Sequence, residues 1–286
     1  MHRLTSTVRR LSAAFLLPLA LLLPGCAIAQ DKDYSPTVGQ EGKDVIWVPT
    51  PQALVEKMLD MAKLTAKDIH FDLGSGDGRT VIAAAKRGAQ AVGVEYNPDM
   101  VALSERAAAK EGVSAKARFI NGDIFQTDFS KATVLTLYLL PSLNIKLRPT
   151  ILKMKPGTRV VSHAFSMDDW QADQTENVEG RTGYLWIVPA PVEGSWRWNG
   201  SGSGPKDYQV KLRQQFQKVE GEVVLDGKPG QLRDAKLRGD QISFTVLDAS
   251  GVRRDFSGRV AGNAMQGVVK LPDGSSEAKW SATRAN

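Results

Sequence analysis

The stretch Asp72-Leu73-Gly74-Ser75-Gly76-Asp77-Gly78 contains the feature that decides the fold of this chain. It follows the strand-like run 68–71 and precedes residues 80–85, which have the composition of a helix start. Glycine has no side chain, so a turn with three glycines lets a ligand contact the bare backbone. A strand, a glycine-rich turn and a helix in this order are typical of a nucleotide-type site in an α/β domain.

The acidic residues of this turn distinguish between two classes of ligand. A dinucleotide site follows the pattern G-x-G-x-x-G, and the position of its third glycine is Arg79 here. The carboxylates of Asp72 and Asp77 would repel a pyrophosphate. They favour a ligand that carries positive charge and no phosphate, such as S-adenosylmethionine. A purely structural turn is the remaining alternative.

Two later acids stand where further strands are expected to end. Glu95 ends the strand-like run 91–95, at the offset where a carboxylate binds ribose hydroxyls in nucleotide folds. A third strand at 117–120 precedes Asp123, which could accept a hydrogen bond from an adenine amino group, and Ile124, which could cover the ring. The alternatives are a solvated charge for Glu95 and an ordinary Asx turn for Asp123.

Strand and helix signals alternate up to about residue 190. We expect strands near 69–73, 90–95, 116–120, 132–138 and 158–163, and helices near 79–87, 98–111 and 143–154. Thr50-Pro51 is expected to supply the N-cap and first position of an earlier helix, and 183–188 a last strand that closes the sheet. This order predicts an α/β fold: a Rossmann-like, doubly wound, mostly parallel sheet that binds ligands at the carboxyl ends of its strands.

The pattern changes after Pro189 and Pro191. Short alternating strands are expected at 196–198, 208–212, 221–225, 241–246 and 267–271, with glycine and aspartate turns between them. Asp226-Gly227 and Asp273-Gly274 are strong hairpin signals. Residues 191–286 are therefore predicted to form a small antiparallel all-β sandwich or barrel, and no residue in them suggests catalysis.

The first 29 residues have the pattern of a signal peptide, with a basic start and an apolar run at 11–23. Residues 30–43 are predicted to be a linker. Two processing routes compete: cleavage after the small-x-small site 27–29, or lipidation of Cys26 in a lipobox-like stretch, which would attach the chain to a membrane. An uncleaved anchor is a third alternative. The expected location is the periplasm or, for a lipoprotein, the envelope membrane.

Composition limits the remaining classes of function. The chain has 286 residues, of which 42% are hydrophobic, and a formal net charge of +6, so it can bury a sizeable core in one or two domains. Its basic residues form no stripe interleaved with aromatics, which argues against nucleic acid as a partner. Cys26 is the only cysteine, and the three histidines are scattered, so no disulfide or metal site is expected. His70 is predicted inside a buried strand and His163 at a strand end.

With these motifs in place, the chain resembles class I S-adenosylmethionine-dependent methyltransferases. More narrowly, it resembles the bacterial relatives of the mitochondrial lysine methyltransferases that modify the ATP synthase c-subunit and the adenine nucleotide translocase. The matching stretches are 47–51, 72–79, 81–88, 92–98 and 162–170, within a domain at 44–190. The resemblance implies S-adenosylmethionine as the cofactor and a protein lysine as the methyl acceptor. The signal peptide and the C-terminal extension depart from that family and leave the acceptor open.

The cofactor-binding candidates combine the motif residues with neighbours that could cover the ligand. They are Thr50, Asp72, Gly74, Ser75, Gly76, Asp77, Gly78, Glu95, Asp123 and Ile124. Trp47 and Pro49 could fold over the cofactor beside Thr50, although Trp47 is equally typical of a packing residue. No metal ligand is predicted.

Methyl transfer from a sulfonium needs positioning more than a nucleophilic side chain. Holding the acceptor and methyl carbon about 3–3.5 Å apart can supply roughly 7–11 kcal/mol. The stretch 136–141 is the predicted mouth for the acceptor, and Tyr138 is the candidate catalytic residue that would orient the amine. A core aromatic is the alternative for Tyr138, and Phe165 and Trp170 are predicted to be structural.

The predicted function is that of an exported methyltransferase that methylates a protein lysine. A small-molecule methyltransferase and a non-enzymatic envelope binding protein built on the same scaffold are the alternatives. A nicotinamide oxidoreductase is disfavoured by Arg79 and the acids of the turn. The oligomeric state is not predicted.

Overall fold

The computed structural model describes residues 1–2, 34–200, 204–273 and 276–285. Residues 3–29 of the predicted signal peptide, with its cleavage sites and Cys26, lie outside the described residues, and so does Gly274 of the second hairpin signal. The first domain contains the helices α1 Gln52–Met61, α2 Arg79–Lys86, α3 Pro98–Lys110 and α4 Pro141–Ile151. Its strands are β1 Ile69–Leu73, β2 Gln90–Glu95, β3 Ala117–Asn121, β4 Val134–Leu137, β5 Arg159–His163, β6 Gln174–Val178 and β7 Arg181–Ile187.

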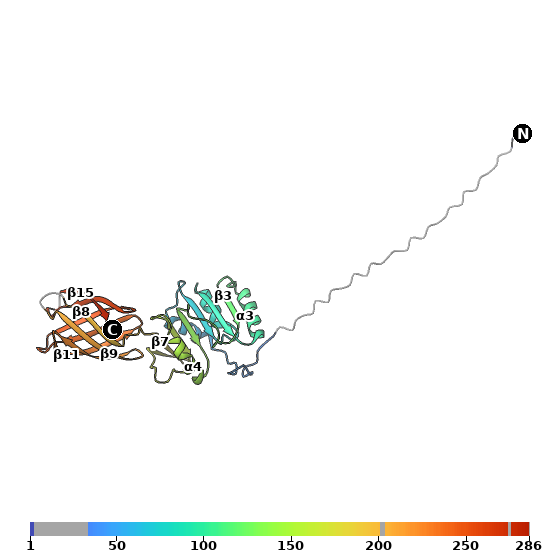
Figure 1. The fold of residues 1–286 in the computed structure, drawn as a ribbon. Coiled ribbons are helices and arrows are strands. Elements are labelled where there is room, and N and C mark those ends of the chain that lie inside the picture. The colour runs from blue at the N-terminus through green and yellow to red at the C-terminus, as the bar shows by residue number, and fades with distance from the viewer. Residues whose placement is uncertain (3–33, 201–203, 274–275, 286) are drawn as a thin grey trace. The chain divides into compact units, whose positions relative to one another are not determined.

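The predicted α/β fold is confirmed. The seven strands form one sheet in the order β3-β2-β1-β4-β5-β7-β6, with β1 to β5 parallel (Figure 1). The run predicted to close the sheet is β7, which pairs antiparallel with β5. The edge strand β6 was not predicted. Its sequence, Gln174–Val178, has only one apolar residue, and it lies half-exposed against β7, so burial supplied no strand signal.

Helices cover both faces of the sheet, as a doubly wound fold requires. Apolar side chains of α1 and α2 pack on strand residues such as Ala91 and Val134 on one face. On the other face, Leu147 and Ile151 of α4 pack with Leu135 of the sheet. Because successive side chains of a strand point to opposite faces, His70 and Asp72 share the face covered by α1 and α2. This places a histidine and the carboxylate of the glycine turn side by side on one strand.

The start of α1 differs from the prediction. The helix begins at Gln52 with Pro51 as its N-cap, and no side chain caps it. The predicted N-cap, Thr50, instead forms a 3.0 Å hydrogen bond between its Oγ1 and Nδ1 of His163. Both side chains are buried, so a buried partner on β5 takes the hydroxyl that would otherwise have capped the helix. Asn97-Pro98, which repeats the pattern, does cap α3 through the Asn97 side chain.

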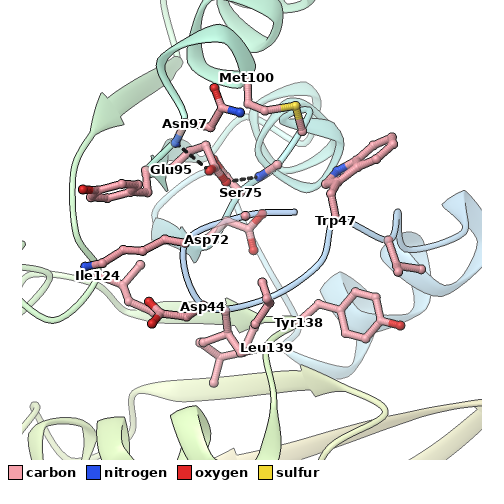
Figure 2. A pocket seen from close by; sticks show the side chains of 18 of the residues that line it. Asp44, Trp47, Asp72, Ser75, Glu95, Asn97, Met100, Ile124, Tyr138 and Leu139 are labelled. Atoms are coloured by element: carbon pink, nitrogen blue, oxygen red, sulfur yellow. Dashed lines mark hydrogen bonds between the residues drawn. The ribbon is translucent and has the colours of Figure 1, made fainter. Parts of the chain in front are cut away.

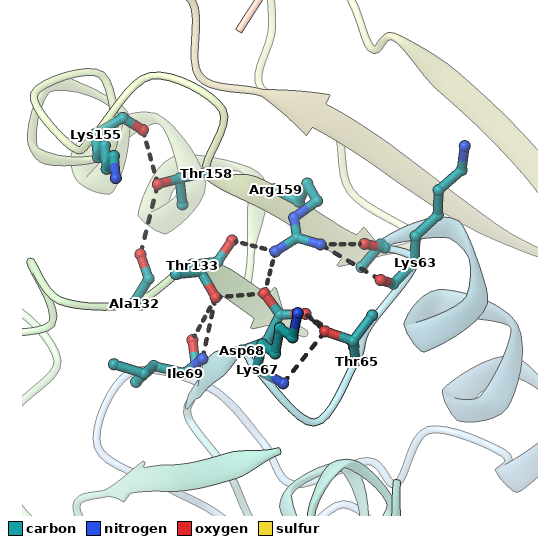
Figure 3. Close-up of polar contacts among 11 residues, drawn as sticks. Lys63, Thr65, Lys67, Asp68, Ile69, Ala132, Thr133, Lys155, Thr158 and Arg159 are labelled. Atoms are coloured by element: carbon teal, nitrogen blue, oxygen red, sulfur yellow. Dashed lines mark hydrogen bonds and ion pairs between the residues drawn. The ribbon is translucent and has the colours of Figure 1, made fainter. Parts of the chain in front are cut away.

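A polar cluster holds the amino-terminal ends of β1, β4 and β5 together (Figure 3). The carboxylate of Asp68 accepts hydrogen bonds from Thr133 Oγ1 at 2.7 Å and from the backbone N–H of Thr65 at 2.8 Å, and it forms an ion pair with Arg159. Arg159 also donates to the carbonyl oxygen of Ala62 at 2.9 Å. Burial alone would raise the pKa of Asp68, but these donors hold it below its usual value. The cluster lies at the end of the strands opposite the glycine turn, which is consistent with a structural role.

The C-terminal domain is a closed antiparallel barrel, one of the two predicted forms. Its strands are β8 Gly194–Asn199, β9 Asp207–Gln215, β10 Lys218–Leu225, β11 Lys228–Arg238, β12 Gln241–Leu247, β13 Arg253–Ala261, β14 Ala264–Lys270 and β15 Glu277–Arg284. Successive strands pair with each other, and β15 pairs with β8 to close the barrel. The strands β11, β13 and β15 were not predicted; β11 buries only Leu237, and β13 and β15 consist mostly of charged and polar residues.

The hairpin predicted at Asp226-Gly227 is confirmed and joins β10 to β11. Both residues have positive φ, 49° and 77°, as a type I′ turn requires. Inside the barrel, Trp198, Phe256 and Trp280 belong to one aromatic core. Within the described part of the chain, every helix is too short or too polar to span a bilayer.

Candidate functional site

A cavity of about 320 Å³ lies at the carboxyl ends of β1, β2 and β4 (Figure 2). This volume falls at the lower end of the range for small-molecule sites. Its lining contains ten residues singled out from the sequence: Thr50, Asp72, Gly74, Ser75, Gly76, Asp77, Glu95, Asp123, Ile124 and Tyr138. The structure therefore brings together nearly all of the predicted site around one hollow.

Gly78 is the predicted cofactor residue that does not line the cavity. It precedes α2 with a φ of 77°, and a Cβ built on it would lie 2.8 Å from Ser104 and Phe119. Gly78 thus allows α3 and β3 to pack closely against the turn. Gly76 has a different place, because it lines the cavity and its Cβ would lie 2.8 Å from Nε1 of Trp47.

Glu95 connects the glycine turn to the start of α3. Its Oε2 accepts a hydrogen bond from the backbone N–H of Gly76, and its Oε1 accepts one from that of Asn97, both at 2.9 Å. Each carboxylate oxygen has a second lone pair. Glu95 is therefore held in place by the backbone and keeps acceptor capacity for the hydroxyls of a ribose.

Asp72 carries the most perturbed carboxylate of the cavity. Its side chain is only 6% exposed, and its Oδ1 accepts a 2.6 Å hydrogen bond from Oγ1 of Thr136. Burial raises the pKa of Asp72 to about 7; the charges of Asp77 and Glu95 add to the rise, while the bond from Thr136 opposes it. A cation bound in the cavity would favour the ionised form of this group.

A buried histidine completes this chain of hydrogen bonds. Nε2 of His70 lies 2.8 Å from Oγ1 of Thr136, and both side chains are fully buried. Burial lowers the pKa of His70 to about 3, so its imidazole is neutral. Thr136 has one hydroxyl hydrogen, which it donates to the ionised Asp72, so His70 must then donate through Nε2–H. Nδ1 of His70 has no hydrogen-bond partner among the described residues. The prediction of a histidine inside a buried strand is confirmed.

Arg79 connects the glycine turn to the segment before α1. Its Nη2 and Nε bind the carboxylate of Asp77 at 2.5 and 3.0 Å, and its Nη1 donates to the carbonyl oxygen of Thr50 at 2.9 Å. In the sequence, Arg79 indicated only that the third glycine of a dinucleotide-binding pattern is absent. An arginine two residues from an aspartate in the turn was the signal for the ion pair, whereas the contact with Thr50 depends on the fold.

Asp123 is paired with a residue of the predicted linker. Its Oδ2 lies 2.6 Å from Nζ of Lys43, which also lies 4.7 Å from the centroid of the Tyr96 ring. The hydrogen bond from Lys43 lowers the pKa of Asp123, and a second one from the backbone N–H of Phe125 lowers it further. The bond from Phe125 shows that Asp123 also forms the Asx turn considered as its alternative role.

The segment that carries Lys43 belongs to the wall of the cavity. Residues 40–50 line it continuously, and the backbones of Gly39 and Gln40 pair with that of Trp47 through two 2.9 Å hydrogen bonds. The predicted domain boundary at residue 44 therefore falls inside a loop that contributes to the site. Its polar composition resembles that of a linker, so the sequence alone did not distinguish the two.

Aromatic and apolar side chains surround Tyr138 at another part of the cavity. Its ring centroid lies 3.8 Å from that of His163 and 6.2 Å from that of Phe165. Burial lowers the pKa of His163 to about 4, and the charge of Arg181 contributes, so this imidazole is neutral as well. Leu140 lines the same cavity and is 41% exposed. The surroundings of Tyr138 are therefore largely uncharged.

The cavity fits S-adenosylmethionine in the charges that line it. Its carboxylates suit a sulfonium and an ammonium, and a side chain at Gly76 would narrow the space beside Trp47. The hydroxyl of Ser75 is buried without a hydrogen-bond partner among the described residues. Asp72, Glu95 and Asp123 are the residues that would hold the ammonium, the ribose and the adenine.

Comparisons with known proteins identify relatives of the domain that contains this cavity. The family model of the ANTKMT methyltransferase domain matches residues 72–174. A protein-lysine N-methyltransferase of Saccharolobus islandicus is 42% identical over 151 residues, which are 50% of this chain and 94% of that protein. The lysine N-methyltransferase of the ATP synthase c-subunit from Rattus norvegicus is 34% identical over 130 residues, 45% of this chain and 60% of that protein.

A solved structure is similar as well. A protein described as an RNA methyltransferase from Salinibacter ruber, in complex with S-adenosyl-L-homocysteine, is 48% identical, with a TM-score of 0.50. The similarity covers 51% of this chain and 96% of that one. Since these similarities span nearly all of the archaeal and Salinibacter proteins, neither has room for a domain the size of the barrel.

The family, the cofactor and the class of reaction follow from these findings together. The matches fall on the domain that contains the cavity, and the Salinibacter structure holds the demethylated form of the cofactor. The chain belongs to the family of S-adenosylmethionine-dependent methyltransferases that includes the protein-lysine N-methyltransferases, with S-adenosylmethionine as its cofactor.

Proposed function

We propose that this chain transfers the methyl group of S-adenosylmethionine to the ε-amine of a lysine in a protein acceptor. The observation that carries the proposal is the aromatic and apolar surroundings of Tyr138, beside a cavity whose other walls bear carboxylates. The archaeal and rat relatives, both named as lysine N-methyltransferases, support it. Methyl transfer is the class of reaction that the chain shares with its relatives, and lysine as the acceptor is our proposal.

The acceptor must lose a proton before it can attack. A lysine amine has an unperturbed pKa of about 10.4, so presenting it neutral at pH 7.5 costs roughly 4 kcal/mol. Apolar surroundings such as Leu140 and Phe165 disfavour the ammonium and lower that cost. With a pKa of about 4, His163 is too weak a base to take the proton, and it adds no positive charge beside the amine.

The residues of the chain act by binding and orienting. The bound cofactor supplies an activated methyl group. Asp72 and Glu95 would hold its charged and ribose ends, and the hydroxyl of Tyr138 would accept a hydrogen bond from the acceptor amine and direct its lone pair. The acceptor amine would lose its proton to solvent at the exposed rim before it attacks. Methyl transfer would then leave a methylammonium on the acceptor and release S-adenosylhomocysteine.

An acceptor screen tests this proposal. Purified protein is incubated with S-adenosylmethionine labelled in the methyl group and, separately, with envelope proteins, with total RNA and with small molecules from the same cells. Label recovered as methyl-lysine after acid hydrolysis supports the proposal. Label that is removed by ribonuclease, or label confined to small molecules, would overturn it. The RNA arm is included because the similar Salinibacter protein is named an RNA methyltransferase.

We also propose that the chain is exported, on the strength of the pattern in residues 1–29. Mass spectrometry of the mature protein from envelope fractions tests this. A new N-terminus at Gln30 indicates ordinary cleavage, and a lipid on Cys26 indicates a membrane-attached lipoprotein. A cytosolic protein that retains the first 29 residues would contradict export.

A further inference from the structure

The barrel has a hollow of its own, separate from the methyltransferase cavity. It has a volume of about 1040 Å³ and is lined by residues of β11, β12, β13, β14 and β15. None of these lining residues is acidic, and four are basic: Lys236, Arg238, Arg259 and Lys279. Nothing in the methyl-transfer reaction accounts for this surface.

The strand register arranges the lining in two rows. One row runs across five strands from Lys236 through Ser243, Ser257 and Val268 to Lys279. Neighbouring strands are about 4.8 Å apart, so the two lysines stand roughly 19 Å apart along the sheet. Lysines at both ends and small side chains between them form a trough.

The second row lies two residues further along each strand, on the same face. It contains Arg238, Gln241 and Arg259, which are paired in register. Arg259 forms a 2.7 Å ion pair with Asp240, but its side chain stays 63% exposed. A surface pair of this kind contributes little and leaves the guanidinium available to another anion.

Two facing glycines let β13 and β14 approach closely at the hollow. Between the two rows, Gly258 pairs with Gly267 across β13 and β14. A Cβ on Gly267 would lie 1.9 Å from the carbonyl oxygen of Ser257, so the two strands approach more closely than side chains would allow. The neighbouring position on β15 is the buried Trp280, which packs into the barrel. Both glycines are among the lining residues of the hollow.

The lining chemistry selects an anion with hydrogen-bonding groups. A concave surface lined by basic side chains and no acidic ones concentrates the electrostatic potential. Ser243, Ser257 and Gln266 add neutral donors and acceptors of the kind that bind peptide groups. Trp280 is the lining aromatic and is only 5% exposed, so no platform for stacking nucleic-acid bases is present among the described lining residues. A concave trough also does not match the planar surface of a bilayer.

We propose that this trough binds an acidic, extended segment of a polypeptide, whose carboxylates pair with Lys236, Lys279, Arg238 and Arg259. The site is independent of the methyl-transfer proposal, because neither the cofactor nor Tyr138 takes part in it. The archaeal relative, which has no room for a barrel, would lack this binding activity.

Binding of a fluorescein-labelled decamer of glutamate to the full-length protein, followed by fluorescence anisotropy, tests the proposal. The test variant is Lys236→Glu with Lys279→Glu. The matched control is Lys218→Glu with Lys228→Glu, because these exposed lysines on β10 and β11 lie outside the hollow and the net charge changes equally. We expect about tenfold weaker binding for the test variant and less than a twofold change for the control. Binding of the wild type should weaken as salt is raised.

Other outcomes would overturn the proposal. They are equal weakening in the test and control variants, absence of binding at low salt, or tighter binding of a thymidine decamer or of phosphatidylglycerol vesicles than of the glutamate decamer. Thermal unfolding of each variant verifies the fold. If the glutamate variant unfolds, Lys236→Gln with Lys279→Gln takes its place, with Lys218→Gln and Lys228→Gln as the control.

Discussion

The hydroxyl of Thr136 donates a 2.6 Å hydrogen bond to Oδ1 of Asp72, in the interior of the sheet. The two residues are register partners on β4 and β1. The same hydroxyl lies 2.8 Å from Nε2 of His70. Which of the two partners receives the hydroxyl hydrogen of Thr136 depends on whether Asp72 is ionised. Ionised Asp72 accepts from Thr136, whereas protonated Asp72 can donate to it. The carboxylate that faces the cofactor cavity is thereby coupled to a buried, neutral histidine.

We expect cofactor binding to strengthen as the pH rises from 6 to 7.5. The pKa of Asp72 is raised to about 7 in the ligand-free protein, so the ionised fraction grows from about a tenth to about three quarters over this range. The affinity for S-adenosylmethionine should therefore increase roughly fivefold to tenfold, as measured by calorimetry. The control is Asp72→Asn, which should bind weakly and without this pH dependence. If the affinity of Asp72→Asn for the cofactor rose with pH as steeply as that of the wild type, a group other than Asp72 would be responsible for the pH dependence.

Asp72 is also expected to destabilise the fold at neutral pH. Below pH 3.8 the carboxyl is protonated in both folded and unfolded chains; between 3.8 and about 7, only the unfolded chain ionises. The free energy of unfolding therefore falls as pH rises through this window. Asp72→Asn keeps an acceptor for Thr136 and removes the buried charge. Urea unfolding should show it to be more stable than wild type at pH 8, by on the order of 2–4 kcal/mol, and similar at pH 4. If Asp72→Asn were less stable than the wild type at pH 8, the buried charge of Asp72 would not destabilise the fold.

Removal of the Thr136 hydroxyl should affect both of its partners. Thr136→Val leaves Asp72 without its donor and His70 without its partner in the interior, at a cost of about 1–3 kcal/mol in unfolding free energy. The pKa of Asp72 should rise further, so the midpoint of the pH dependence of cofactor binding moves upward. Thr136→Ser keeps the hydroxyl and serves as the control. An unchanged midpoint in Thr136→Val would refute the coupling.

A side chain at Gly76 is expected to abolish cofactor binding. In Gly76→Val the new Cβ would lie 2.8 Å from Nε1 of Trp47, in the wall of the cavity, and the residue would keep a φ of 54°. Gly112→Val is the control that separates backbone strain from blockage of the cavity. Gly112 has a φ of 69°, and the space around its Cβ position is open. Both variants should lose stability, but only Gly76→Val should lose binding in calorimetry. If folded Gly76→Val still bound the cofactor, the glycine turn would not be part of the cofactor site.

Tyr138→Phe should separate an orienting role from a packing role. The ring would remain packed against His163 at a centroid distance of 3.8 Å, so stability and cofactor affinity should change little. The loss of the hydroxyl should lower kcat about tenfold or more, because the acceptor amine is no longer held in line. Steady-state kinetics with an acceptor protein identified in the screen provide the measurement. Unchanged kcat would assign Tyr138 to the core.

Local sequence patterns made most of the polar residues that line the cavity predictable. A glycine turn after a strand, an acid at the end of the next strand and a third acid after another strand depend on short segments and on the parallel order of the sheet. Since parallel strands present their carboxyl ends at one edge, Asp72, Glu95 and Asp123 were expected together, and all three line the cavity. The hairpin at Asp226-Gly227 was equally local, because a type I′ turn needs particular residues at two adjacent positions.

Contacts between distant segments were decided only by the tertiary structure. Lys43 and Asp123 are 80 residues apart, and Thr50 and His163 are 113 apart. Whether such side chains meet depends on where several strands and loops place their backbones, which no local pattern encodes. Thr50 had the sequence of an N-cap, yet its hydroxyl binds His163 because β5 brings the imidazole beside it. Sequence alone thus determined the fold class and the acids that line the cavity, which follow from local periodicity and turn chemistry. The loop at residues 40–50, the buried path from Asp72 to His70 and the basic lining of the barrel hollow arose from packing and strand register.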